Sequence, residues 1–580
     1  MLKEISPRLK RLFLSSRFFL RKYPMMAFSR RYLFLVLISI ASLGLYLSLS
    51  QSFDVLTLDT GAPFRREFYA TLFDAMQSAA PEGQLNMDTA RDKERCKSGD
   101  ASAFSKDFEK TSFENLEACL HLSDEQLSMM SEKHEQYLNT MNSWSLTDDE
   151  KHKLFPNQRG VVTIGGGRFS VISLTMLETL RDRGTTLPVE VMIPPGDEGD
   201  DDYCNVVLPK LNAKCIYMSN VLPAEVLEKV EIKRFQNKVI GLLLSSFKEV
   251  VYVDADCLSL QPLDDVFDKP AYVKNGMILW PDIWKRVTAP AFYKITNVKV
   301  DTSKRVRFGP DDVSPVSRYE PSTESNAVRM LKKVPYHDLD GSMPDPTTEA
   351  GQMVINKMQH LPSLLLSAYY NIYGKWYYKM LSQGTSGEGD KETFMAAAHV
   401  LKLPYYQVKS EVKFDGFSDK DGFHGISLYQ QDFQQDYRAY KKAKRWVGRH
   451  KSEVSGYEQD YDVKRQFLEK LMRPDGKELD SMFGHIGYHK FEPMELSKKH
   501  IYVSEDGKHF RGFRRKEVIK KFDLELFNFG VLEKYLCHED PIKFVFYKNV
   551  MQTPEWDNMC KYLKNHTSFL EDTHEDTWSS

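Results

Sequence analysis

The spacing of apolar residues changes near residue 160 and divides the chain. After this point, short apolar runs predict buried strands over 160–166, 188–194, 212–218 and 249–254. Residues 169–183 and 224–246 have helical spacing of apolar positions between those runs. Strands that alternate with helices are typical of an α/β fold with a mainly parallel sheet. We therefore expect one α/β catalytic domain over residues 156–570.

The flanks of that domain have weaker patterns. Residues 51–155 are polar and helix-prone, with faint helical spacing over 123–143. They predict a helical stem that holds the catalytic domain away from a membrane. The last residues, 571–580, are polar and are expected to be a disordered tail.

An uncharged run over residues 32–50 follows a basic tail over residues 1–31. The tail has nine lysines and arginines against one acid, Glu4. A helix needs about 20 apolar residues to cross a bilayer, and this run is longer than the roughly 7–15 of a signal peptide core. Because basic flanks stay in the cytosol, the pattern predicts a type II single-pass anchor with a lumenal catalytic domain. A buried core helix is the alternative.

The net charge and the cysteines limit the partners and the cellular compartment that we expect. The formal net charge is −2, so no overall field favours nucleic acid as a partner. Seven cysteines follow the uncharged run, without a zinc-binding spacing. Disulfides suit a lumenal setting, and neighbours in sequence give the pairs Cys96–Cys119, Cys204–Cys215 and Cys537–Cys560. A glycosylation sequon at Asn565 agrees with that setting.

The strongest local signal is the strand 250–253 that runs directly into Asp254-Ala255-Asp256. At the carboxyl end of such a strand both carboxylates face the crevice where α/β sheets bind ligands. Their hard oxygens suit Mn²⁺ or Mg²⁺, which would bridge the diphosphate of a nucleotide-sugar. Asp254 and Asp256 are therefore candidate metal ligands, and Asp254 is also a candidate donor contact. A solvated turn is the alternative.

A glycine run, residues 165–167, separates the first strand from the first helix. Glycine lets backbone amides approach a ligand, and a helix N-terminus favours phosphate. Gly166 and Arg168 are therefore candidate donor-binding residues. The run does not match the dinucleotide-binding fingerprint, and the alternative is a plain turn.

Longer blocks of sequence carry a family resemblance. They are Arg234–Lys238, 242–262, Tyr336–Ser342, 344–357, 364–371 and 381–394. Together they resemble the fungal mannosyltransferases that build cell-wall mannan, most closely the α-1,2-mannosyltransferases that start side branches. The related α-1,3-mannosyltransferases are the runner-up.

The resemblance implies a GT-A type fold with a Rossmann-like nucleotide-sugar domain, a GDP-mannose donor and retention of anomeric configuration. It implies a Golgi membrane enzyme that acts on mannan or N-glycan outer chains of glycoproteins, with other Golgi mannosyltransferases as candidate partners in a complex. Within the matching blocks, Lys238 becomes a candidate donor contact.

Two later motifs complete the candidate site. Glu388 and Asp390 lie in a glycine-bounded loop before a predicted helix and are candidate catalytic or acceptor-binding carboxylates, with helix capping as the alternative. Glu349 is a candidate sugar contact, with an acid at a helix start as the alternative. His485 is the candidate third metal ligand, with His489 as its rival and a structural histidine as the alternative. Lys490 is a candidate diphosphate contact.

Two other function classes are compatible with parts of the sequence. One is a glycan-binding subunit with a decayed site, against which the intact Asp254, Asp256 and loop carboxylates argue. The other is a hydrolase, which needs two acids across the scissile bond. A D-x-D pair at a strand end suits a diphosphate better.

Overall fold

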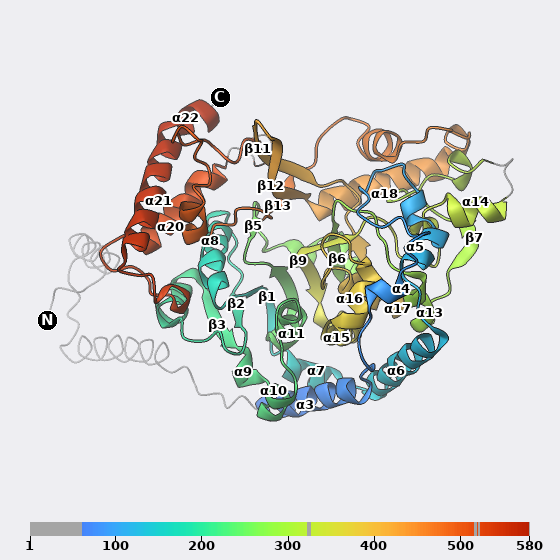
Figure 1. Ribbon diagram of the computed structural model, residues 1–580, viewed down its shortest axis with the longest axis horizontal. Coiled ribbons are helices and arrows are strands. Elements are labelled where there is room, and N and C mark those ends of the chain that lie inside the picture. Colours follow the sequence, from blue (N-terminus) through green and yellow to red (C-terminus); the bar gives the residue numbers. More distant parts are fainter. Residues whose placement is uncertain (1–60, 322–325, 516–518, 520–521, 579–580) are drawn as a thin grey trace, which may run out of the picture. The chain divides into compact units, whose positions relative to one another are not determined.

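The computed structural model of the chain describes residues 61–321, 326–515, 519 and 522–578 (Figure 1). The basic tail, the uncharged run expected to be a membrane anchor, and residues 51–60 all lie outside the described residues. Among the helices that are described, none has the length and apolar character needed to cross a membrane.

A seven-stranded mixed sheet forms the centre of the described unit, in the order β10-β6-β9-β4-β1-β2-β3. The strands are β1 (Asn157–Ile164), β2 (Val189–Ile193), β3 (Ala213–Tyr217), β4 (Phe247–Val253), β6 (Met277–Pro281), β9 (Thr348–Asn356) and β10 (Tyr406–Gln407). β1, β2, β3 and β4 are parallel, and β9 runs antiparallel to both β4 and β6. Since β10 is parallel to β6, all strands except β9 end at the same edge. This confirms the expected α/β fold class.

The sheet is buried on both faces because consecutive residues within its strands are apolar and buried, as over 250–253 of β4. Val250 and Val251, neighbours on β4, pack into two different hydrophobic clusters. Successive residues of a strand point to opposite faces, so each cluster marks one side of the sheet. One side packs against α11 (Gln236–Leu244) and α15 (Lys357–Ile372), and the other packs against α8 (Arg168–Asp182).

The helix expected over residues 224–246 is two helices, α10 (Ala224–Lys229) and α11. Val230 is extended and Arg234 has a φ of 53°, so the backbone leaves the helical region between them. The apolar spacing continues across this break because Ile232 is also buried, which is why periodicity alone predicted one element.

A second, antiparallel sheet has the order β11-β12-β13-β5. Its strands are β5 (Cys257–Ser259), β11 (Lys413–Asp419), β12 (Gly422–Gln431) and β13 (Ser481–Ile486). β5 begins one residue after Asp256, and His485 of β13 pairs with Cys257. The second sheet therefore brings a histidine from late in the chain next to the D-x-D turn.

Residues 61–155, expected to be a stem, belong to the same compact unit as the remainder of the described chain. They form α3 (Ala62–Ser78), α4 (Met87–Ala90), α5 (Phe113–Cys119), α6 (Asp124–Ser143) and α7 (Asp148–Leu154). Tyr69 of α3 donates to the Leu243 carbonyl at 2.8 Å, and Tyr137 of α6 donates to the Leu365 carbonyl at 2.9 Å. Both tyrosines are at most 1% exposed, so these helices complete the core.

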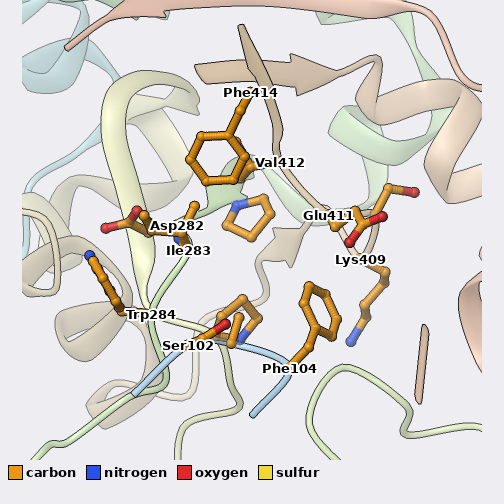
Figure 2. Close-up of a pocket in the computed structure, with 13 residues that line it drawn as sticks. Ser102, Phe104, Asp282, Ile283, Trp284, Lys409, Glu411, Val412 and Phe414 are labelled. Carbon is orange, nitrogen blue, oxygen red and sulfur yellow. Dashed lines mark hydrogen bonds between the residues drawn. The ribbon is translucent and has the colours of Figure 1, made fainter. Parts of the chain in front are cut away.

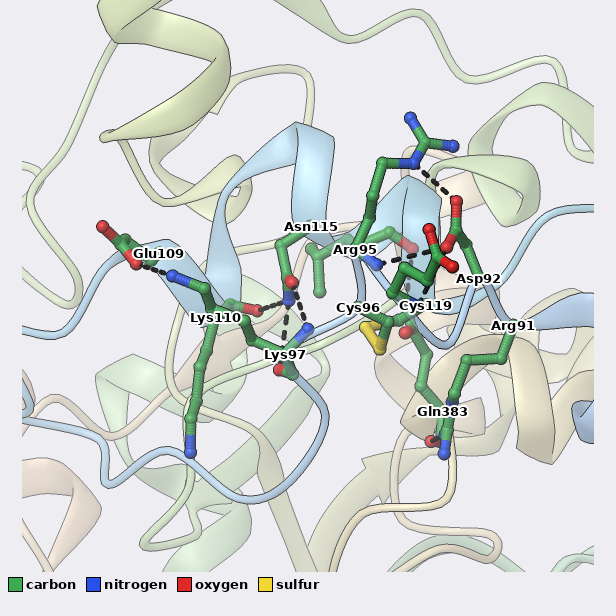
Figure 3. Close-up of a disulfide and its surroundings, with 12 residues drawn as sticks. Arg91, Asp92, Arg95, Cys96, Lys97, Glu109, Lys110, Asn115, Cys119 and Gln383 are labelled. Atoms are coloured by element: carbon green, nitrogen blue, oxygen red, sulfur yellow. Dashed lines mark hydrogen bonds and ion pairs between the residues drawn. A yellow bond between two sulfur atoms is a disulfide. The ribbon is translucent and has the colours of Figure 1, made fainter.

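Three disulfides confirm the pairs expected from the sequence, and Cys257 is a buried free thiol. Figure 3 shows the Cys96–Cys119 bond together with Arg91 and Gln383. Arg91 donates to the Gln383 carbonyl at 3.0 Å, and Gln383 donates to the Leu116 carbonyl at 3.1 Å. The disulfide segment therefore supports the start of the loop that carries Glu388 and Asp390.

The remaining elements cover the sheets and the C-terminal part. They are α9 (Met218–Val221), α12 (Pro270–Asn275), α13 (Pro290–Ile295), β7 (Asp301–Arg305), α14 (Asn326–Lys332), β8 (Leu339–Asp340), α16 (Gly374–Ser382), α17 (Thr393–Val400), α18 (Phe433–Arg449), α19 (Pro493–Lys498), α20 (Leu524–Leu536), α21 (Pro554–Asp572) and α22 (His574–Trp578). Within the tail expected to be disordered, the His574 imidazole lies 2.9 Å from the Asp523 carboxylate.

Candidate active site

The D-x-D turn is fixed by the backbone of three strands. The Asp254 amide donates to the Gly351 carbonyl of β9 at 2.7 Å. The Asp256 carbonyl accepts from the Ile486 amide of β13 at 2.9 Å. The Asp254 side chain is 27% exposed and that of Asp256 is 6% exposed. Both carboxylates are thus held at the sheet edge where the parallel strands end, which is the edge where α/β folds bind ligands.

Asp254 is paired with Lys238 of α11. The Lys238 ammonium lies 3.0 Å from Asp254, 3.3 Å from Asp390 and 2.7 Å from the Ala350 carbonyl. Burial opposes a charge on Lys238, but the two carboxylates outweigh burial and raise its pKa. Tyr252 also donates to Asp254, at 2.5 Å. Lys238 is therefore a fixed positive charge within the candidate site.

Asp256 faces two cationic groups from late in the chain. The Lys490 ammonium contacts its carboxylate, and His485 Nε2 lies 3.5 Å away. His485 Nδ1 lies 3.2 Å from Glu349. Burial lowers the pKa of His485, but Glu349 more than offsets this and the pKa is raised. Burial would raise the pKa of Glu349, yet the His485 charge and bonds lower it to about 2.

Within the described residues, no group of three or more His, Cys, Asp or Glu side chains is arranged to hold a metal ion. The chemistry of the donor set still fits a hard divalent cation, since Asp254, Asp256 and His485 supply carboxylate oxygens and an imidazole around one turn. The Asp256 carboxylate already accepts one cationic group, the Lys490 ammonium.

The glycine run is required largely by packing. A Cβ on Gly165 would lie 2.6 Å from Val191, and one on Gly166 would lie 2.6 Å from Asp197. Gly166 also has a φ of 88°, and its amide donates to the Ser170 hydroxyl at 3.1 Å. One amide expected to be available for a donor phosphate is therefore satisfied within the chain.

Arg168 is exposed at the first position of α8, with its guanidinium 5.1 Å from the Phe169 ring. It does not contact Asp254 or Asp256 directly. Burial lowers the pKa of Lys490, Asp254 opposes this effect, and the charge of Arg168 adds to it. Arg168 and Lys490 therefore act on the same region of the site.

The loop carboxylates Asp390 and Glu388 have different surroundings. Asp390 is buried beside Lys238; burial raises its pKa, and Lys238 counteracts part of that shift. Glu388 lies 2.6 Å from Lys379 and accepts from the Gly384 amide at 3.0 Å. The structure thus brings Asp390 to the D-x-D cluster, the charged residues around the turn: Asp254, Asp256, Lys238, His485 and Lys490. Glu388 instead bonds within its own loop, to the Gly384 amide.

The sequence did not point to Asp282 or to a role for Lys391. Asp282 follows the end of β6, and its carboxylate lies 2.6 Å from the Lys391 ammonium. Lys391 follows Asp390 in the chain, so it links the β6 end to the D-x-D cluster. An acid directly after an apolar strand was the available signal, and it is the same signal that marked Asp254.

Comparison with known proteins gives consistent sequence matches. The family model Mannosyl_trans3, which describes mannosyltransferases, matches residues 158–432. The chain is 42% identical over 540 residues to the α-1,2-mannosyltransferase MNN5 of Saccharomyces cerevisiae strain YJM789, covering 89% of this chain and 91% of that protein. It is 37% identical over 551 residues to the α-1,2-mannosyltransferase MNN2 of Saccharomyces cerevisiae strain S288c, with coverages of 91% and 90%.

Solved structures match only loosely. The glycosyltransferase GlyE of Streptococcus pneumoniae TIGR4 aligns over 65% of this chain and 64% of its own, at 11% identity and a TM-score of 0.27. A score this low does not establish a shared fold, so the fold class rests on the sheet topology described above.

Proposed function

Because this chain belongs to the fungal α-1,2-mannosyltransferase family, we propose that it transfers mannose from GDP-mannose to mannose residues of mannan or N-glycan outer chains, forming α-1,2 linkages with retention of configuration. The chain is a glycosyltransferase, and family membership over most of its length supports the α-1,2 linkage. The α-1,3 linkage is the runner-up. GDP-mannose and retention follow from the family resemblance, as does a GT-A type fold.

One observation carries the proposal: Asp254 and Asp256 follow β4 directly and lie beside Lys238 and Lys490, at the sheet edge where α/β folds bind ligands. A nucleoside diphosphate-sugar brings a compact negative charge and a polar sugar. Two ammonium groups next to the D-x-D turn supply charge-assisted hydrogen bonds to phosphate oxygens.

Each charged residue has a distinct role in this proposal. Lys490 leaves Asp256 and binds the diphosphate as the donor enters, while Lys238 keeps Asp254 and Asp390 in position. Asp390 holds a hydroxyl of the transferred sugar or of the acceptor. Arg168, at the start of α8, binds the donor from the outer side.

We propose Mn²⁺ or Mg²⁺ as the cofactor, held by Asp254, Asp256 and His485. When bound, it would stabilise the negative charge that develops on the leaving diphosphate. Glu349 orients the His485 ring through Nδ1 and leaves Nε2 directed to Asp256.

We also propose that the enzyme is a type II single-pass protein of the Golgi membrane, with glycoprotein glycans as its acceptors. The basic tail and the uncharged run support this topology, and the three disulfides suit an oxidising compartment. Fluorescence microscopy of the tagged full-length chain tests it, since a cytosolic signal would contradict the proposal.

The direct test is transfer from GDP-mannose to α-mannobiose, followed by linkage and anomer analysis of the product. We expect an α-1,2 product that needs Mn²⁺ or Mg²⁺ and is not formed from UDP-sugars. Asp256→Ala should abolish transfer without changing the melting temperature measured without metal. Full activity in the presence of EDTA would exclude a metal cofactor. An α-1,3-linked product would favour the α-1,3-mannosyltransferase alternative.

A further inference from the structure

A separate cavity of about 280 Å³ opens beyond the ends of β6 and β10 (Figure 2). Its walls come from residues 102–104, 281–284, 346, 409–412 and 414, which are far apart in sequence. Small-molecule sites usually enclose about 300–1,000 Å³, so this one is at the lower end of that range. It contains none of the residues of the D-x-D cluster.

The lining combines aromatic rings with charged groups. Figure 2 shows Phe104, Trp284 and Phe414 on different sides of the space, with Asp282 on one flank and Lys409 and Glu411 on the other. The three charged lining residues are each paired within the chain, Asp282 with Lys391, Lys409 with Asp312 at 3.2 Å and Glu411 with Lys464 at 2.8 Å. Paired carboxylates keep lone pairs that accept from hydroxyls, and the C–H faces of a pyranose pack on aromatic rings. Because these residues bring no uncompensated positive charge, the lining fits a neutral sugar ring better than a phosphate.

The walls are fixed by backbone hydrogen bonds. The Ala103 amide donates to the Ile283 carbonyl at 2.8 Å, and the Thr347 amide donates to the Trp284 carbonyl at 2.9 Å. Ser102 and Trp284 also form an antiparallel bridge. These bonds tie the wall segments to one another through the chain's own backbone, which lowers the cost of ordering them around a ligand.

The cavity and the D-x-D cluster lie on the same edge of the seven-stranded sheet. β6 and β4 are both antiparallel to β9, which lies between them, so Asp282 and Asp254 follow the ends of two parallel strands. Two strand spacings of about 5 Å separate β4 from β6. The two aspartates are also offset along β9, because the Asp254 amide bonds to Gly351 and the Asp282 amide bonds to Thr347. Asp282 lines the cavity and bonds to Lys391, next to Asp390. A chain molecule that extends from the D-x-D cluster along this edge reaches the cavity.

We propose that this cavity binds a mannosyl residue of the acceptor glycan other than the one that is glycosylated. The proposal rests on the proposed mannosyltransferase function and adds an acceptor subsite to it. An oligomannoside would occupy both the transfer centre and the cavity, whereas a single mannoside would occupy only the transfer centre. The cavity thus makes the enzyme select oligomeric acceptors.

The test uses the full-length chain and the variant Phe414→Ala, whose ring is 38% exposed on β11. The matched control is Phe423→Ala, an exposed phenylalanine on the paired strand β12 that is outside the cavity. We expect Phe414→Ala to raise the KM for mannotriose about tenfold, as loss of one stacked ring does. The KM for methyl α-mannoside and the acceptor-independent hydrolysis of GDP-mannose should not change, and Phe423→Ala should match the wild type.

Calorimetric titration of mannotriose in the absence of donor gives an independent measurement. We expect binding to the wild type that is weakened by Phe414→Ala and also by Trp284→Ala. Equal mannotriose affinity and KM in the wild type and Phe414→Ala would overturn the subsite. If the wild type binds mannotriose through Phe414 but neither transfers nor hydrolyses GDP-mannose, the subsite stands and the donor assignment fails.

Discussion

The ammonium group of Lys490 lies against the carboxylate of Asp256, the second acid of the D-x-D turn. The two residues are 234 positions apart in the sequence, and the antiparallel pairing of β13 with β5 brings them together. A lysine therefore neutralises the carboxylate that we propose as a metal ligand. In the proposed function, Lys490 leaves this contact when donor and metal bind.

Lys490→Ala should separate the competition of Lys490 with the metal for Asp256 from its binding of the donor diphosphate. Without the competing ammonium, Mn²⁺ should half-activate the enzyme at a lower concentration, while the KM for GDP-mannose should rise about tenfold because a phosphate contact is lost. Metal titration of the transfer rate and donor kinetics measure both. Lys499→Ala, which removes an exposed lysine bonded to Glu495, is the control. Unchanged values for both constants would exclude Lys490 from the site.

Asp390→Asn and Glu388→Gln should differ strongly although the two acids are two residues apart. Asp390 touches Lys238 within the cluster, whereas Glu388 is bonded to Lys379 and the Gly384 amide. We expect kcat to fall about a hundredfold or more in Asp390→Asn, in the range for a lost acid–base or positioning group. Glu388→Gln should stay within about threefold of the wild type. Similar losses in both variants, at matched melting temperatures, would contradict this assignment.

Removal of residues 1–60 should leave transfer activity intact, because the compact unit begins at Gly61. Removal of residues 1–155 should abolish soluble expression, since α3 and α6 cover core residues and their buried tyrosines bond to Leu243 and Leu365. Circular dichroism and activity of both truncated proteins check the prediction. A folded, active protein that starts at residue 156 would show that this segment is a separate stem after all.

Stability should depend on pH through His134 of α6. Burial lowers its pKa to about 4 from an ordinary 6.5, and its Nε2 lies 2.9 Å from the Tyr370 hydroxyl. The unfolded chain binds the proton more readily, so the stabilisation is complete above pH 6.5 and is lost as the pH falls towards 4. Between pH 8 and pH 5 the loss is about 2 kcal/mol.

The variant His134→Gln should show a smaller decrease over that pH range, because glutamine can bond to Tyr370 but does not titrate. Urea unfolding at both pH values measures the free energy of unfolding for the two proteins. Parallel decreases in the wild type and the variant would mean that His134 is not responsible.

The local sequence patterns predicted most features that depend on a single strand or a single turn. The strand that ends at Asp254 and the parallel sheet followed from apolar runs, because burial on both faces leaves a continuous apolar signature. The Lys238–Asp390 and Lys490–Asp256 contacts did not follow from spacing, since each joins residues more than a hundred positions apart. The role of residues 61–155 was also hidden, because their buried faces are narrow stripes in mostly polar helices.

The position of α3 and α6 also has a consequence for the synthesis of the chain. The first helices bond to partners that are synthesised much later. Tyr69 and Tyr137 donate to the carbonyls of Leu243 and Leu365, and the Ala79 carbonyl accepts from the Tyr369 hydroxyl. Ribosomes add about 5–20 residues per second, so the apolar stripes of the first helices stay uncovered for tens of seconds. α3 and α6 are thus buried only after the middle third of the chain has emerged, and a newly made chain needs protection from aggregation until then.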